Sequence, residues 1–208
     1  EAMKYYANIL TPFSPLVIKK IEEVLSSNVP VNMIATSHGV IWRDNPTQIV
    51  EKYLEWAKEY QENQITIVYD SMWNATRRMA EAIEEGIKIE DKNVVVKLFN
   101  AAHADKNDII TEIFKSKAIL IGASTVNNSI LSSISGILDM IKGLGFKNKK
   151  AAAFGSYGWS GESVKIITER LKDAKLEVIN DGIKELWNPD EEGLNRCMEY
   201  GINFAKNL

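Results

Sequence analysis

The chain has 208 residues, a net charge of -3, 45% hydrophobic residues and 25% charged residues. These values are typical of a soluble globular protein, and the mild acidity argues against nucleic acid or an anionic membrane as a partner. No apolar run approaches the ~20 residues that a membrane span needs, and no signal peptide is recognisable. The single cysteine, Cys197, excludes an intrachain disulfide and any cysteine-based iron–sulfur or zinc-ribbon site. We therefore expect a reducing, cytoplasmic setting.

The first 62 residues follow no regular alternation of strands and helices. Ser14 can cap a helix with an apolar stripe, residues 31–35 are typical of a short strand, and a third apolar stripe follows Pro46. The stripe after Pro46, which includes Tyr53 and Trp56, is typical of a core or a domain interface, and it has too little predicted sheet to cover it. We therefore expect this sequence to be a piece of a longer protein, with a domain boundary at about residues 61–64.

From residue 63 to residue 208 the pattern is regular. Apolar runs predict strands at residues 65–69, 94–99, 118–121, 151–154 and 176–179, and helical spacing predicts a helix after each of them. Strands that alternate with helices form right-handed βαβ units and a parallel sheet. The predicted fold is an α/β, doubly wound, five-stranded parallel sheet, with a strand order that spacing alone does not reveal.

Three loops that follow predicted strands are rich in hydroxyl, amide, glycine and aromatic side chains. They comprise Ser71, Met72, Trp73, Asn74, Ala75 and Thr76; Ser124, Thr125, Val126, Asn127 and Asn128; and Ser156, Tyr157, Gly158, Trp159, Ser160 and Gly161. The carboxyl ends of parallel strands meet at one edge of a sheet, which is where doubly wound folds bind ligands. We expect these residues to form a single binding site.

The first loop predicts a phosphate site. It leads from a buried strand into a helix, whose free first-turn amides and dipole favour an anion. Ser71, Asn74 and Thr76 add short side-chain donors, and the loop contains no lysine or arginine, unlike a Walker loop. The alternative is an ordinary capped turn between a strand and a helix.

The aromatic residues of these loops predict a flat ligand. Trp73, Tyr157 and Trp159 can stack on a ring system, although they can also cap the core or form a subunit contact. Asn127 and Asn128 can bond the pyrimidine edge of a flavin or form an Asx-turn. A phosphate and a flat ring together indicate flavin mononucleotide (FMN) as the cofactor, and we expect no catalytic acid or base among these residues.

His38 is the candidate metal ligand. It follows the predicted strand at residues 31–35 and precedes Gly39, a position that suits a metal-bound imidazole. No cluster of histidines and carboxylates with ligand spacing accompanies it in the sequence. A structural histidine is therefore the alternative.

The three loops, in this order after the segment Thr36–Arg43 with its His-Gly-x-Ile-Trp pattern, resemble the flavodiiron proteins, also called A-type flavoproteins. The resemblance covers the whole chain. It implies that residues 1–62 are the C-terminal remnant of a metallo-β-lactamase-like diiron domain and that residues 63–208 are a flavodoxin-like FMN domain. In that family FMN passes electrons to a diiron centre that reduces oxygen or nitric oxide, and His38 matches the last histidine ligand of the irons.

The resemblance also implies partners. Family members receive electrons from a donor such as rubredoxin or a reduced deazaflavin, and they form head-to-tail homodimers or larger homo-oligomers. The family's His-x-Glu-x-Asp-His cluster, its next histidine and its bridging aspartate have no counterpart here, so this chain offers one of about six ligands for two irons. We expect the full-length protein to be the oxidoreductase.

The same fold also serves other functions. A stand-alone flavodoxin-like electron carrier would explain the loops but not the first 62 residues. A response regulator would need an aspartate after the third strand and a lysine after the fifth, where this chain has Gly122-Ala123-Ser124 and Asn180-Asp181. A flavin-dependent quinone reductase is a further alternative that the fold does not separate.

Overall fold

The computed structural model describes residues 1–27 and 29–208. These residues form two compact units, Glu1–Tyr60 and Gln61–Leu208. Within the described ranges, none of the helices combines the length and the apolar character that crossing a bilayer requires.

The first unit consists of short helical segments and two longer helices. Its elements are α1 (Ala2–Tyr5), the π-helical turn η1 (Tyr6–Leu10), the 3-10 turn η2 (Thr11–Phe13), α2 (Ser14–Ser26) and α3 (Thr47–Ala57). The rings of Tyr6, Tyr53 and Trp56 contact one another, with centroids 5.3–5.7 Å apart. This aromatic cluster explains the stripe predicted on the helix after Pro46.

Two local predictions for this unit are wrong. Ser14 does not cap α2, because its hydroxyl donates to the carbonyl of Thr11 and pairs with the hydroxyl of Tyr6. The strand expected at residues 31–35 is reduced to one antiparallel bridge between Ile34 and Trp42. A strand needs a neighbouring ladder to satisfy its backbone groups, and the described part of this unit offers only that bridge.

The second unit contains the predicted parallel sheet. Its strands are β1 (Glu62–Asp70), β2 (Val95–Asn100), β3 (Ser116–Ala123), β4 (Lys150–Tyr157), β5 (Glu177–Val178) and β6 (Ile183–Leu186). All pairings are parallel and the strand order is β2-β1-β3-β4-β5, with β6 also paired to β4. The doubly wound prediction is confirmed. The order reverses between β1 and β3, which is the place where such folds bind ligands.

The fifth position of the sheet is divided between two strands. β5 pairs with the start of β4 and β6 with its end, in the register Phe154↔Ile183 to Tyr157↔Leu186. The chain turns between them, where the Asn180 side chain accepts a hydrogen bond from the amide of Gly182 at 2.9 Å and Gly182 has a φ of 82°. The strand predicted at residues 176–179 therefore covers only the first part of this edge.

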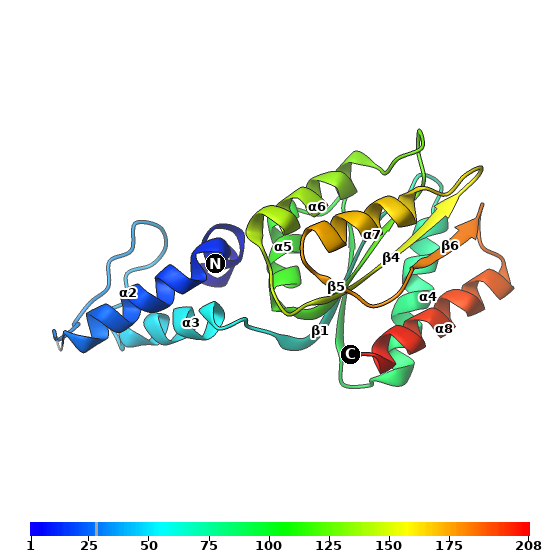
Figure 1. The fold of residues 1–208 in the computed structure, drawn as a ribbon. Coiled ribbons are helices and arrows are strands. Elements are labelled where there is room, and N and C mark those ends of the chain that lie inside the picture. The colour runs from blue at the N-terminus through cyan, green and yellow to red at the C-terminus, as the bar shows by residue number, and fades with distance from the viewer. Residues whose placement is uncertain (28) are drawn as a thin grey trace. The chain divides into compact units, whose positions relative to one another are not determined.

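Helices cover both faces of the sheet (Figure 1). They are α4 (Ala75–Glu90), α5 (Lys106–Lys115), α6 (Ser132–Leu144), α7 (Ser163–Asp173) and α8 (Glu191–Lys206). α4 and α8 pack together on one face, and α5, α6 and α7 lie on the other. A Cβ on Gly86 or Gly201 would lie 2.0 Å from the Met198 carbonyl or 2.2 Å from the Ile83 carbonyl, respectively. These glycines let α4 and α8 approach backbone to backbone, and a buried apolar cluster, which includes Ile83, lies between them and the sheet.

Candidate functional site

A pocket of about 400 Å³ lies where the loops after β1, β3 and β4 meet at the carboxyl edge of the sheet. Its volume is in the range typical of ligand sites. The residues that line it are Met72, Trp73, Ala75, Ser124, Thr125, Ser156, Tyr157, Gly158, Trp159, Trp187 and Asn188. The structure thus brings together residues from all three predicted loops, as their positions after parallel strands led us to expect.

Three buried hydroxyl groups tie the loops to one another. The Thr76 hydroxyl lies 2.9 Å from the Ser124 hydroxyl and 2.9 Å from the Ser156 hydroxyl, and the two serine hydroxyls are 3.2 Å apart. Each residue comes from a different loop, and all three are buried. A second link joins the last two loops, because the Thr125 amide donates to the Ser156 carbonyl at 2.8 Å. This hydrogen-bonded triangle, Thr76-Ser124-Ser156, fixes the floor of the site.

The start of α4 has no side-chain cap. Its N-cap residue, Asn74, has a left-handed backbone with φ 63° and makes no side-chain cap bond. By contrast, Asp105 and Asp190 cap α5 and α8 through their carboxylates. The first-turn amides of α4 therefore lack the N-cap acceptor that α5 and α8 have; the N-cap residues of α6 and α7 make no such bond either.

Ser71 supplies a further unused donor beside this helix start. Its side-chain oxygen is buried and has no hydrogen-bond partner, whereas its backbone amide donates to Asp70 at 2.7 Å. A buried hydroxyl without a partner is unfavourable unless a ligand completes its bonding. A hydroxyl of this kind next to uncapped first-turn amides would suit a phosphate group.

Large aromatic side chains surround the open side of the pocket. Trp73 is 85% exposed and Trp159 is 89% exposed, so neither ring contributes to the core. Tyr157, the last residue of β4, lines the pocket, and the Lys184 ammonium of β6 sits 5.4 Å from the centre of its ring. The alternative that these tryptophans cap the core does not fit their exposure, whereas exposed rings beside a pocket are suited to covering a flat ligand.

Eight residues of the predicted site do not line the pocket: Ser71, Asn74, Thr76, Val126, Asn127, Asn128, Ser160 and Gly161. Ser71, Asn74 and Thr76 support it as described above. Val126 and Ser129 form an antiparallel bridge across a tight turn in which Asn127 and Asn128 have φ values of 48° and 55°. Two consecutive positive φ angles are the mark of a type I′ turn, for which asparagine is well suited.

The last two of these eight residues belong to the loop after β4. The Ser160 hydroxyl donates to the Glu162 carboxylate at 2.8 Å. Gly161 has a φ of 70°, and a Cβ there would lie 3.0 Å from the Tyr157 ring. Gly161 therefore lets the loop turn back over Tyr157, which keeps that side chain at the pocket.

Two residues of the pocket, Trp187 and Asn188, were not predicted from the sequence. They follow β6, and the Trp187 amide donates to the Tyr157 carbonyl at 2.7 Å. The sequence does carry a signal for them, because a tryptophan followed by Asn-Pro-Asp marks a loop before a helix. That loop could be assigned to the ligand edge only if the short strand β6 were recognised first.

The chemistry of the lining fits FMN. The described residues that line the pocket include no acidic and no basic side chain, so binding relies on neutral donors, backbone groups and aromatic faces. The unpartnered Ser71 hydroxyl and the uncapped start of α4 suit the phosphate, and the exposed indoles suit the tricyclic ring. Each part of the expected cofactor thus has a matching set of residues.

His38 lies in the first unit and is exposed. Its ring packs against Tyr5, with centroids 5.7 Å apart. Across residues 1–27 and 29–208 there is no group of three or more histidine, cysteine, aspartate or glutamate side chains that could hold a metal ion. The described residues of this chain therefore do not by themselves make a diiron site.

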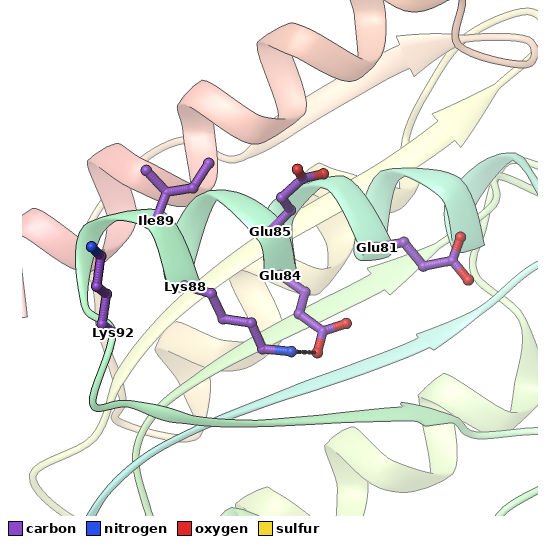
Figure 2. Close-up of a pocket in the computed structure, with 6 residues that line it drawn as sticks. All are labelled: Glu81, Glu84, Glu85, Lys88, Ile89 and Lys92. Carbon is purple, nitrogen blue, oxygen red and sulfur yellow. Dashed lines mark hydrogen bonds and ion pairs between the residues drawn. The ribbon is translucent and has the colours of Figure 1, made fainter.

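A second hollow, of about 440 Å³, lies along α4 and the turn that follows it (Figure 2). Its lining residues are Glu81, Glu84, Glu85, Lys88, Ile89 and Lys92. Lys88 and Glu84 pair with each other at 2.5 Å, and Glu81 pairs with Arg77 at 2.8 Å. Charged side chains along one helix and the turn after it, several of them paired with one another, are typical of a solvated helix face. We assign no ligand to it.

A family model and several curated proteins match this chain. Residues 67–201 match the flavodoxin family. The anaerobic nitric oxide reductase flavorubredoxin of Klebsiella pneumoniae is 55% identical over 206 residues, which are 99% of this chain and 42% of that protein. The protein of the same name from Escherichia coli O1:K1 is 54% identical, over 99% of this chain and 43% of its own length. The chain thus spans less than half the length of these curated relatives.

Solved structures agree with this result. The rubredoxin oxygen:oxidoreductase of Desulfovibrio gigas matches with a TM-score of 0.92 and 35% identity, over 99% of this chain and 51% of that chain. The flavodiiron protein of Giardia intestinalis matches with a TM-score of 0.91 and 31% identity, over 98% of this chain and 50% of that chain. An archaeal flavodoxin matches 69% of this chain with a TM-score of 0.62 and 31% identity, over 97% of its own length. The predicted resemblance to flavodiiron proteins is confirmed.

Proposed function

The chain belongs to the flavodoxin family, and on that premise we propose that residues 63–208 bind FMN and transfer electrons. We propose further that the whole protein is a flavodiiron oxidoreductase, in which the FMN serves a diiron centre that reduces oxygen or nitric oxide. One observation carries the first proposal. Ser71, whose buried hydroxyl has no partner, shortly precedes the uncapped start of α4, and the residues that follow it, Met72, Trp73 and Ala75, line a neutral pocket with exposed indoles.

The phosphate end of the site works through neutral donors. The Ser71 hydroxyl and the first-turn amides of α4 donate to an anion, and the α4 dipole adds a favourable field. The triangle Thr76-Ser124-Ser156 holds the loops around this position. Because no lysine or arginine lines the pocket among the described residues, the charge of the phosphate is compensated by dipoles alone.

The ring end of the site orients the cofactor and excludes water. Trp73 and Trp159 offer indole faces, and the loop backbones near Thr125 and Gly158 can approach a ring edge closely. Bound FMN would supply the electron-transfer chemistry. The chain's own residues need only hold it, shield it and set its potential through their hydrogen bonds, and no side chain here acts as an acid or a base.

For residues 1–62 we propose the C-terminal part of a metallo-β-lactamase-like diiron domain, with His38 as one iron ligand. The match of flavodiiron structures over nearly the whole chain supports this assignment. Since about six ligands are needed for two irons, the others would have to come from outside this chain. A head-to-tail homodimer would let the FMN of one subunit serve the irons of another, and a rubredoxin or a reduced deazaflavin would be the electron donor. We also propose a cytoplasmic location, with which the free and buried thiol of Cys197 is compatible.

Counting cofactors tests both proposals. The full-length gene product is purified, its flavin spectrum is recorded, and FMN and iron are measured per chain. We expect one FMN and two irons. FMN without iron would favour a stand-alone electron carrier over the oxidoreductase, and a protein that binds neither would refute both proposals. The 208-residue chain, tested alongside, should bind FMN in a fluorescence titration and should retain no pair of irons.

A further inference from the structure

We propose that Trp187 is a flavin-binding residue and that its segment, Trp187-Asn188, is a fourth binding segment of the site. This inference rests on the proposed function, because it concerns the same pocket. It goes beyond the three loops that the sequence and the family resemblance assign. Both residues line the pocket, and they reach it from β6, the strand that completes the fifth position of the sheet.

The backbone of Trp187 is strained. Its φ is 55°, a left-handed conformation that is a genuine outlier for a bulky side chain. The other described non-glycine residues with positive φ are five asparagines, a glutamate and a lysine, so Trp187 is the aromatic exception among them. Such a conformation persists only where the surroundings enforce it, and it is found mainly at functional sites.

Neighbouring contacts enforce this conformation. The Trp187 amide donates to the Tyr157 carbonyl at 2.7 Å, which continues the pairing of β6 with β4 by one residue. Just before it, Glu185 is buried and accepts two hydrogen bonds from Arg196 of α8, at 2.7 Å and 3.0 Å. Just after it, the Asn188 side chain accepts a hydrogen bond from Arg78 of α4 at 2.9 Å. The segment is therefore fixed on both sides of the strained residue.

Burial does not account for the strain. The Trp187 side chain is 59% exposed, so its indole adds little to the core. Its ring instead lies across the backbone of Gly158, where a Cβ would come within 2.9 Å of the ring, and it meets Trp159 edge to face with centroids 5.5 Å apart. Both contacts are with residues that line the pocket. The left-handed turn thus aims the indole at the site and away from the interior.

Together, Trp187 and Trp159 form an aromatic wall of the pocket. A tryptophan held at a fixed place, half-exposed and edge-on to a second tryptophan, can cover a flat aromatic ligand at little further cost in side-chain freedom. Stacking of a base on an aromatic side chain typically changes affinity by roughly 5- to 150-fold when the side chain is removed. We therefore expect Trp187 to contribute on this scale to the affinity for FMN.

The test separates binding from folding. Trp187→Gly removes the indole and also removes the strain, because glycine adopts positive φ freely. We expect this variant of the 208-residue chain to unfold in urea at the same midpoint as the wild type or at a higher one, without FMN. Its Kd for FMN, from a flavin-fluorescence titration, should rise about 10- to 100-fold. The fluorescence of its bound FMN should also increase, because an indole that quenches it is gone.

Two further variants serve as controls. Trp187→Phe keeps an aromatic ring and should bind FMN within about threefold of the wild type. Leu186→Ala removes the neighbouring exposed apolar side chain, which does not line the pocket, and should leave the Kd unchanged.

An unchanged FMN affinity in Trp187→Gly, with normal binding by the wild type, overturns this inference alone. A large loss of stability in that variant also overturns it, because Trp187 would then be a folding residue. A wild-type chain that fails to bind FMN refutes the proposed function as well.

Discussion

Replacing Thr76 by valine tests whether the hydroxyl triangle holds the site together. The Thr76 hydroxyl is fully buried and makes two hydrogen bonds, to Ser124 and Ser156, at 2.9 Å each. Valine keeps the branched shape and removes both bonds. At about 1 kcal/mol net for each hydrogen bond, Thr76→Val should lower the free energy of unfolding by about 2 kcal/mol. The two serine hydroxyls keep each other as partners at 3.2 Å, so the loss should not be much larger.

The chain offers a matched control in α7. Thr168 is also a buried helical threonine, but its hydroxyl has no hydrogen-bond partner. Thr168→Val removes a polar group whose burial is uncompensated, so the free energy of unfolding should stay the same or rise by about 1 kcal/mol. The helix propensities of threonine and valine are similar, so they cancel in both variants.

Urea unfolding followed by circular dichroism measures both changes, and a flavin-fluorescence titration measures the second effect of Thr76→Val. Because Thr76 fixes the loops that carry the proposed phosphate donors, we expect the free energy of FMN binding to weaken by about 1–3 kcal/mol. Thr168→Val should bind FMN like the wild type. Equal effects of the two substitutions on stability, or an unchanged FMN affinity in Thr76→Val, would refute the reasoning about the triangle.

Three further predictions concern single side chains. Burial lowers the pKa of Lys149 to about 7. Between pH 7 and about 10.5 the unfolded chain therefore binds more protons than the folded chain, so the free energy of unfolding should rise with pH. Urea titrations at several pH values should show that Lys149→Met flattens this rise. Ser71→Ala should leave the stability of the FMN-free chain unchanged or slightly raised, since its buried hydroxyl has no protein partner to lose, and it should weaken FMN binding about tenfold in a fluorescence titration because the proposed phosphate donor is gone. Burial raises the pKa of the Cys197 thiol to about 12, so a thiol reagent at pH 8 should label it only as fast as the chain unfolds, and fast labelling in the native state would contradict its burial.

The sheet and its helices were predictable because their signals are local and strong. The run at residues 65–69 is apolar except for Thr66 and forms the centre of β1, which is buried between two layers of helices. The strand β6 was not predicted because its own sequence lacks such a local apolar signal. Its sequence, Ile-Lys-Glu-Leu, has two charged residues at its centre, which is untypical of a strand in a covered sheet. The glutamate, Glu185, is buried because Arg196 of α8 donates two hydrogen bonds to it. A partner that lies outside the strand cannot be read from the strand's own pattern.

The pocket was predictable in outline and not in its detailed contacts. Parallel topology brings the three loops to one edge, so Ser124 and Ser156 could be assigned to one site from sequence. That Thr76 lies beneath the pocket and not on its surface depends on the rotation of α4 against the sheet. The pairing of Thr76 with both serines depends on the same packing, because residues 48 and 80 positions apart meet only in the folded chain.

The hydroxyls of the site are buried and hydrogen-bonded, whereas its tryptophans are exposed, so substitutions at the two kinds of residue should have different effects on stability and on binding. A buried hydroxyl with two partners belongs to the fold, so its removal should change both stability and binding. Trp73 and Trp159 are almost fully exposed, so their removal should leave the fold unchanged. A ligand that covers about 100 Å² of such a ring gains about 2.5 kcal/mol at 25 cal/mol per Å². Affinity should therefore come mainly from the exposed rings and position mainly from the buried hydroxyls.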